Sequence, residues 1–267
     1  TSKIRSADDL QKVRSFGFRG EALPSIASVS RFTMRTRQPE VPTATELVVD
    51  QGKVVDCREA AAPPGTTIEV AHLFNSVPVR RKFLKTDQTE TAHILHFLRL
   101  TALAHPEIRF RQVVDDRSAL DLPPAEKIDV RLAEIWGRSL LEDLRPFSRR
   151  RGNTQLYGFA GRPGLSRSTR HDLVTIVNGR PVESRTLNFG VLEAYSESIP
   201  KGRYPVALVF LEIDPAALDV NVHPAKREIR FRDEGHVRYL VVETILDLLH
   251  RDPESGPDAL FNTQPGT

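Results

Sequence analysis

The amino-acid sequence predicts an α+β protein with two domains. Between residues 30 and 70, short runs alternate apolar and polar side chains, which is typical of antiparallel strands with one buried face. A segment of helical period at residues 88–104 precedes a proline-rich break at residues 122–125. In the second half, residues 204–213 are almost continuously apolar, as expected of a strand covered on both faces.

Composition excludes several protein classes. The chain has 267 residues, of which 27% are charged and 39% hydrophobic, as in ordinary globular proteins. No apolar run approaches the roughly 18 residues that a membrane helix needs, and no signal-peptide pattern is present. One cysteine, Cys57, excludes an internal disulfide and a zinc site built from cysteines. We therefore expect a cytoplasmic protein.

Near the start of the chain, a glycine-rich loop precedes a predicted helix. The chain begins at Thr1 without a methionine, and we interpret it as a piece of a longer protein. Gly17 and Gly20 bracket an aromatic and an arginine just before a helical pattern at residues 21–29, whose start is limited by Pro24. N–H groups at a helix start attract anions, but the spacing alone favours an ordinary loop-to-helix turn.

The rest of the first half predicts strands and then helices. Strand patterns occupy residues 30–37, 45–50, 53–58 and 66–70, the first three as an antiparallel meander. Pro78 opens a short surface helix at residues 78–85, and a core helix is predicted at 88–104. His93 and His96 on the longer helix have no carboxylate or cysteine partner nearby, so we predict no metal site there.

The second half contains the elements of another domain. The break at residues 122–125 predicts a linker, with a domain boundary near Ala125. A predicted strand at 108–114 precedes this boundary. Beyond it we expect helices at 128–136, 184–198 and 235–249, and strands at 144–150, 154–161, 172–178 and 204–213. The last of these strands is predicted to be central in its sheet. Residues 251–267 are predicted to be a disordered tail or linker.

Arginine is concentrated in one part of the second half. Between Arg138 and Arg185 the sequence contains ten arginines, no lysine and four acidic residues. Guanidinium groups suit the bidentate binding of phosphate. A nucleic-acid-binding surface and a plain solvated surface explain this bias equally well.

Two long motifs resemble one protein family. Gly-Phe-Arg-Gly-Glu-Ala-Leu at residues 17–23 and Asp-Val-Asn-Val-His-Pro-Ala-Lys at residues 219–226 closely resemble the MutL/PMS-type DNA mismatch repair ATPases. Four further matches occur in the family's order, at residues 1–3, 64–67, 80–84 and 177–180. The resemblance implies the GHKL class, named for gyrase, Hsp90-type chaperones, histidine kinases and MutL. Residues 1–125 would then be the C-terminal part of its α/β sandwich and 126–250 a smaller α/β transducer domain.

The resemblance also implies a set of nucleotide-binding residues. The end of the family's ATP lid, whose amides hold the triphosphate, matches Gly17, Phe18, Arg19, Gly20, Glu21, Ala22 and Leu23. The start of the lid matches Thr1, Ser2 and Lys3. Thr66 matches a Gly-Thr position near the nucleotide, and Lys226 matches the transducer lysine that reaches the γ-phosphate. ATP and Mg²⁺ are the implied cofactors.

Two motifs of the family are missing from this sequence. The family's catalytic glutamate and magnesium-binding asparagine form a Glu-x-x-x-Asn pattern, and an Asp-x-Gly-x-Gly segment contacts adenine. Neither pattern occurs in the 267 residues. We therefore expect no catalytic residue and no metal ligand in this chain, which should be inactive alone, whereas the parent protein should hydrolyse ATP.

The family resemblance implies a function in bacterial DNA mismatch repair, associated with the nucleoid. It implies homodimerisation on ATP binding, DNA binding, and contact with a mismatch-recognition protein and downstream repair factors. No membrane association is implied. Candidate DNA-phosphate contacts are Arg149, Arg150, Arg151, Arg162, Arg180 and Arg185. Two alternatives remain: a non-enzymatic DNA-binding or dimerisation module, and a type II topoisomerase ATPase subunit. In topoisomerases the lysine typically follows Gln-Thr, whereas Lys226 follows His-Pro-Ala.

Overall fold

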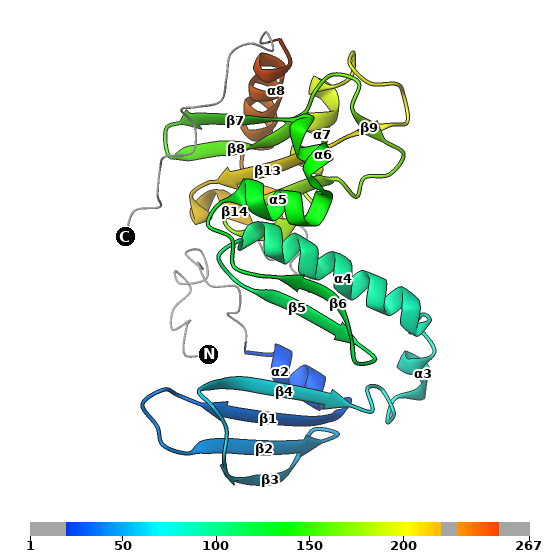
Figure 1. The fold of residues 1–267 in the computed structure, drawn as a ribbon, viewed down its shortest axis with the longest axis vertical. Helices are drawn as coiled ribbons and strands as arrows, with labels where there is room; N and C mark the ends of the chain where they lie inside the picture. Colours follow the sequence, from blue (N-terminus) through cyan, green and yellow to red (C-terminus); the bar gives the residue numbers. More distant parts are fainter. Residues whose placement is uncertain (1–19, 220–228, 251–267) are drawn as a thin grey trace. The chain divides into compact units, whose positions relative to one another are not determined.

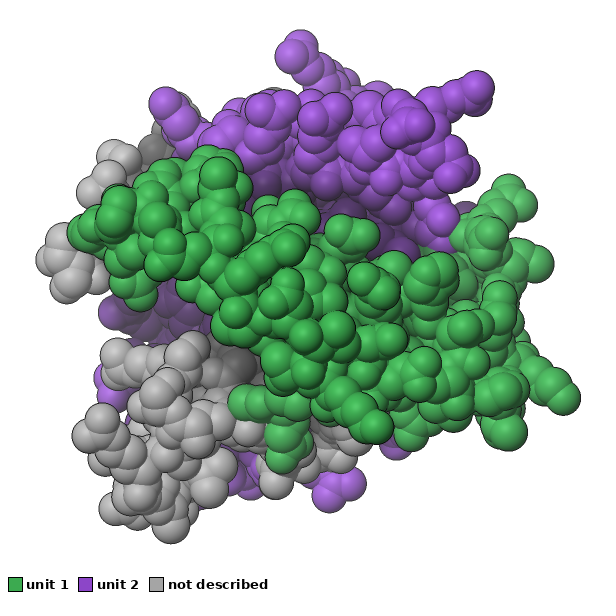
Figure 2. Space-filling model, turned by 90° about the horizontal axis from the view of Figure 1, so that it is seen from below, with its two compact units in different colours: residues 1–90 green, residues 91–267 purple. Residues whose placement is uncertain are grey.

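The computed structural model describes residues 20–219 and 229–250 (Figure 1). The chain divides into two compact units, residues 1–90 and 91–267, which are coloured separately in Figure 2. The predicted tail at residues 251–267 lies outside the described residues.

A four-stranded antiparallel sheet forms most of the first unit. Its strands are β1 (Arg31–Arg37), β2 (Ala44–Asp50), β3 (Lys53–Ala60) and β4 (Gly65–Ala71). Their order is β3-β2-β1-β4, so the first three form the predicted meander and the fourth returns beside β1, as in a Greek key. Gln51 and Gly52 both have positive φ, 48° and 83°, which a tight hairpin turn between β2 and β3 requires.

A short helix covers part of this sheet. Helix α2 (Ala22–Ala27) packs Ala27 against Phe32 and Val49, which lie opposite each other on β1 and β2 and so share one face. Pro24 occupies the first turn, where proline is tolerated because the N–H it lacks would have no acceptor within the helix. The resulting core is small.

Two helices follow the first sheet. Helix α3 (Pro78–Arg81) is shorter than predicted but begins at proline as expected. Helix α4 (Asp87–Ala104) has the predicted extent, and its buried residues, Ala102 and Leu103, lie at its C-terminal end. The prediction that α4 is a core helix therefore holds for its last turns.

The second unit is built on a five-stranded mixed sheet. Its strands are β7 (Leu144–Arg151), β8 (Thr154–Gly161), β10 (Leu173–Val177), β11 (Arg180–Val182) and β13 (Ala207–Glu212). The order β11-β10-β13-β8-β7 places β13 in the centre, which confirms the prediction from its apolar run. Strands β10 and β13 are parallel, and the other pairs are antiparallel.

Helices cover both faces of this sheet (Figure 1). Helices α5 (Ile128–Trp136) and α6 (Arg138–Glu142) and the end of α4 pack against Leu208 and Phe210. Helices α7 (Arg185–Ala194) and α8 (Glu234–His250) pack on the other face, against Val209 and Leu211. The alternation along β13 explains why its sequence is apolar at nearly every position.

Several short elements have no clear sequence pattern. Strand β5 (Phe110–Val114) lies within the strand predicted at 108–114. It pairs with β6 (Arg117–Leu122) in a separate two-stranded sheet, and β6 was not predicted. Asp115 and Asp116 form its turn, with φ of 48° and 61°. Strand β11 and helix α6 were also not predicted. The remaining elements are β9 (Ser166–Arg167) with β12 (Tyr204–Pro205), β14 (Leu218–Asp219) with β15 (Arg230–Phe231), and the 3₁₀ turn η1 (Pro215–Ala217).

The division into compact units falls earlier than the predicted linker. It lies between Glu90 and Thr91, whereas the sequence places a domain boundary near Ala125. The difference has a packing cause, because Leu100, Leu103 and Ala104 of α4 belong to the core that contains α5 and the second sheet. The domain limits 1–125 and 126–250 remain predictions.

Candidate functional site

Four residues of the predicted lid are described, at the start of α2. Gly20 has φ of 68°, a left-handed conformation that glycine adopts without strain. Glu21 is the N-cap residue but makes no side-chain capping bond. The N–H groups of Ala22 and Leu23 therefore have neither a helical acceptor nor a side-chain cap. This exposed end offers donors, although α2 has only six residues.

Thr66 lies near the start of β4, opposite Thr36 of β1. The two hydroxyl oxygens are 2.8 Å apart, so each hydroxyl already has a hydrogen-bonding partner. A hydroxyl can donate one bond and accept others, which leaves Thr66 able to contact a phosphate oxygen. No hydrogen bond links Thr66 to residues 20–23 among those the structure describes.

The other predicted nucleotide-binding residues lie outside the described residues. They are Thr1, Ser2, Lys3, Gly17, Phe18, Arg19 and Lys226. The described members supply N–H and O–H donors, the chemistry that phosphate oxygens require. Within residues 20–219 and 229–250, no group of three or more His, Cys, Asp or Glu side chains could hold a metal ion.

A small pocket lies in the first unit, between the end of α2 and the ends of three strands. Its volume is about 190 Å³, and its lining includes Arg31, Asp50 and His72. Pockets for drug-sized ligands usually measure about 300–1,000 Å³. This pocket is therefore too small for a nucleotide, and none of the predicted lid residues lines it.

A buried carboxylate organises the opposite face of the first sheet. Glu46 on β2 is only 4% exposed and accepts hydrogen bonds from Arg35 on β1 and Arg58 on β3. The Arg58 Nη2 lies 2.6 Å from Glu46 Oε1. The bonds from Arg35 and then Arg58 lower the pKa of Glu46, so the carboxylate stays ionised at neutral pH. Sequence reasoning missed this cluster, although its three members lie on predicted strands.

Two of the predicted DNA-contacting arginines are paired with acidic residues of α8. Arg149 forms ion pairs with Glu243, at 2.9 Å, and with Asp247. Arg151 lies 3.2 Å from the same Glu243, and its guanidinium is 5.4 Å from the ring centre of Tyr239. Carboxylates thus largely balance the charge of both arginines.

Arg150 and Arg162 have different surroundings. Arg150 points to the other face of the sheet from its neighbours, because side chains alternate along β7. Its Nη2 donates to the neutral amide oxygen of Gln155 at 2.7 Å. Arg162 follows β8 and lies 2.9 Å from Asp143. The charge of Arg162 is therefore balanced by a carboxylate, whereas the charge of Arg150 is not, which leaves Arg150 more available to a phosphate.

Arg180 and Arg185 lie near the opposite edge of the sheet. Asn178 and Gly179, with φ of 47° and 75°, turn the chain from β10 into β11, which begins at Arg180. Partial burial lowers the pKa of the Arg180 guanidinium. Arg185 is exposed at the first position of α7, where Ser184 caps the helix. No carboxylate among the described residues forms an ion pair with Arg185.

The side chain of Asn178 fixes this turn to the central strand. Its amide nitrogen donates to the Ile213 carbonyl at 2.9 Å, and its amide oxygen accepts from the Ile213 N–H at 3.0 Å. The pair of bonds imitates the pairing of two strands. Arg180 thus lies on edge strand β11 and Arg149 to Arg151 lie on the other edge strand, β7, so the six arginines do not form one cluster.

The sequence matches one family in two comparisons. A family model described as "DNA mismatch repair protein, C-terminal domain" matches residues 132–250. The DNA mismatch repair protein MutL of Opitutus terrae is 53% identical over 264 residues, covering 97% of this chain and 42% of the relative. The chain belongs to the MutL family. MutL of Syntrophobacter fumaroxidans is 45% identical over 260 residues, covering 97% of the chain and 39% of the relative. The chain thus spans about two fifths of the length of these curated relatives.

Solved structures share the fold of this MutL-family chain. A structure described as the N-terminal domain of a DNA repair protein has a TM-score of 0.76 at 24% identity, covering 89% of this chain and 77% of that one. The Aquifex aeolicus MutL ATPase domain complexed with ADP has a TM-score of 0.60 at 26% identity, covering 79% and 76%. The B subunit of Myxococcus xanthus DNA gyrase has a TM-score of 0.51 at 15% identity, covering 94% and 80%.

These likenesses confirm the predicted GHKL-type α+β fold. They also weaken the topoisomerase alternative, since the gyrase likeness is lower in both identity and TM-score than the MutL one. None of the helices in the described ranges has the length and apolar character needed to cross a membrane.

Proposed function

We propose that this chain is part of a mismatch repair ATPase, in which it supplies the phosphate lid and the lysine that senses the γ-phosphate. The observation that carries the proposal is the similarity of this chain to a MutL ATPase domain complexed with ADP. Relatives at 53% and 45% identity described as DNA mismatch repair proteins support the same role.

In this proposal the chain's own groups bind the phosphates. The N–H groups of Ala22 and Leu23 and the hydroxyl of Thr66 donate to phosphate oxygens, and Lys226 adds a positive charge at the γ-phosphate. Bound ATP would supply the phosphoryl group that is transferred to water, and Mg²⁺ would be the counterion of the ATP phosphates. Because the Glu-x-x-x-Asn pattern is absent from the sequence, neither the general base nor the magnesium ligand comes from these residues.

The proposed ATPase is tested by comparing this chain with a longer protein that also contains the Glu-x-x-x-Asn segment. We expect the longer protein to bind a fluorescent ATP analogue and to release phosphate, and this chain to release none. Fluorescence anisotropy and a phosphate-release assay measure the two activities. Failure of the longer protein to bind nucleotide would overturn the proposal, and would favour a non-enzymatic DNA-binding or dimerisation module.

We further propose that ATP binding promotes homodimerisation and that the second unit binds DNA. Arg150 and Arg185 are the best-placed phosphate contacts, because neither has a carboxylate partner among the described residues. Arg149, Arg151 and Arg162 are in ion pairs, so a DNA phosphate must compete with carboxylates for them. A mismatch-recognition protein and downstream repair factors are the proposed protein partners.

Replacement Arg185→Glu is expected to weaken DNA binding and to flatten its dependence on salt. Loss of one phosphate contact reduces the slope of log K against log salt by about 0.7 to 0.9. The measurement is DNA affinity over a series of salt concentrations. Arg162→Glu is the matched control, since it changes the net charge equally at an arginine already paired with Asp143. An equal effect of both variants would indicate a general charge effect and contradict a contact at Arg185.

A further inference from the structure

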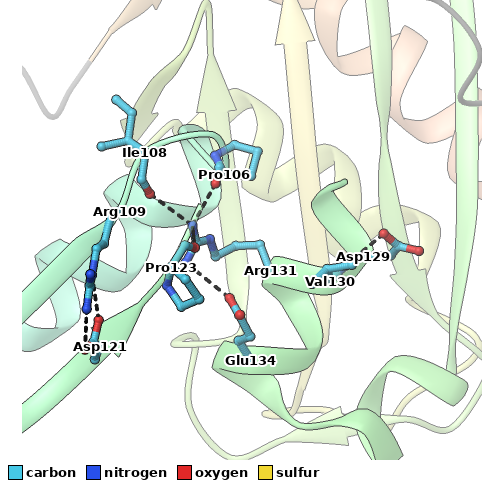
Figure 3. A network of polar contacts seen from close by, with 9 residues as sticks. All are labelled: Pro106, Ile108, Arg109, Asp121, Pro123, Asp129, Val130, Arg131 and Glu134. Atoms are coloured by element: carbon cyan, nitrogen blue, oxygen red, sulfur yellow. Dashed lines mark hydrogen bonds and ion pairs between the residues drawn. The ribbon is translucent and has the colours of Figure 1, made fainter. Parts of the chain in front are cut away.

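A buried arginine joins the separate β5–β6 hairpin to helix α5. Arg131 is fully buried, with a relative exposure of 0%. Its Nη2 donates to three backbone carbonyls, those of Pro106 at 2.7 Å, Ile108 at 3.0 Å and Pro123 at 2.7 Å. Its Nη1 donates to the Glu134 carboxylate at 3.2 Å (Figure 3). One guanidinium therefore holds three carbonyls that are distant from it in sequence.

The three carbonyls lie at the base of the hairpin. Pro106 and Ile108 connect α4 to β5, and Pro123 follows β6. The segments are also bonded to each other, because the Ala125 N–H donates to the Pro106 carbonyl at 2.8 Å. Arg109 and Asp121 add a two-bond ion pair across the base, at 3.0 and 2.8 Å (Figure 3).

Burial makes this arrangement difficult to open. A guanidinium removed from water is costly unless its N–H groups are bonded; here Nη1 and Nη2 are bonded, whereas Nε has no partner among the described residues. The carbonyls lose their partner if the guanidinium moves. Lysine would not replace it, since an ammonium on a flexible chain lacks the planar fork that reaches several acceptors from a fixed position. Opening the segment around Pro123 would leave both a buried charge and backbone groups without partners.

We propose that Arg131 makes residues 122–125 a rigid joint, although their proline-rich sequence predicts a flexible linker. The end of α4, the β5–β6 hairpin and the second sheet then behave as one body. Any rearrangement that accompanies nucleotide binding takes place outside this joint. The inference concerns the chain without nucleotide, so its test is independent of the proposed ATPase activity.

Limited digestion with trypsin tests the joint, because Lys127 lies two residues after it and Lys85 provides an exposed reference site. We expect the wild-type chain to be cut at Lys127 much more slowly than at Lys85. Arg131→Gln and Arg131→Lys should each speed cleavage at Lys127 by about tenfold or more, since local opening then breaks fewer bonds. Arg109→Gln is the matched control. It removes only an ion pair that is exposed to solvent and therefore contributes little to stability, so that rate should stay nearly unchanged.

Hydrogen exchange supplies a second readout on the same proteins. In folded Arg131 variants, the Ala125 amide should lose protection while the amides of β13 keep theirs. If the Arg131 variants do not fold, exchange in the wild-type chain decides. An Ala125 amide protected nearly as well as those of β13 supports the joint. An Ala125 amide that exchanges like an open loop, or folded variants with unchanged cleavage at Lys127, would overturn it.

Discussion

Replacement of Gly158 by alanine is expected to abolish folding of the second unit. Gly158 lies in β8 with φ of 150°, next to central strand β13. A Cβ atom there would lie 1.9 Å from the Leu208 carbonyl oxygen and 3.2 Å from the Phe147 ring. The nearest atom is backbone of the central strand, so it cannot move aside as a flexible side chain could. We expect a loss above about 4 kcal/mol, a large part of the stability of a typical domain.

Urea unfolding followed by circular dichroism measures this effect. Gly164→Ala is a suitable control, because Gly164 also has positive φ, 86°, but no atom lies within 4 Å of the added Cβ. Its expected cost is the backbone strain alone, on the order of 1 kcal/mol. Similar unfolding midpoints for the two variants would contradict the steric explanation for Gly158.

Replacement Lys226→Ala, made in a longer protein that contains the Glu-x-x-x-Asn segment, is expected to lower ATP turnover by about 100-fold or more. Lys226 lies outside the described residues, and the expectation depends on the family motif and the proposed function. Under the proposed function, an ammonium group from the second domain holds the γ-phosphate only until hydrolysis, so its loss would remove both charge stabilisation and the coupling between domains.

A phosphate-release assay measures turnover, and thermal unfolding checks that stability is unchanged. Lys201→Ala is the matched control, an exposed lysine in a turn of the second unit. Equal turnover in the Lys226 variant and the wild-type protein would show that this lysine does not act at the γ-phosphate.

Much of the fold could be predicted because it depends on local sequence patterns. Strand β13 is apolar at nearly every position since helices cover both of its faces, and this pattern is visible without a structure. The turn at Asn178 and Gly179 has the residues that positive φ demands. Strand β11 escaped prediction because it has only three residues, and β6 because it begins directly after its turn.

The candidate sites were predictable in part. Gly20 adopts the left-handed conformation that the glycine-rich motif indicates, and Thr66 lies at the start of a strand. The pairing of Arg149 with Glu243 was not predictable, because 94 residues separate them and only the packing of α8 on the sheet brings them together. A count of arginines therefore cannot separate those available to DNA from those in ion pairs.

The sequence by itself determined the fold class and the family, because these follow from periodicity and from motifs whose residues are neighbours in the chain. Only the tertiary structure decided which partners the charged side chains bind. At residues 122–125, two prolines indicate a break, yet Arg131 reaches the Pro123 carbonyl from the next helix. A buried guanidinium must find several acceptors, and whether distant carbonyls supply them depends on packing that no local pattern records.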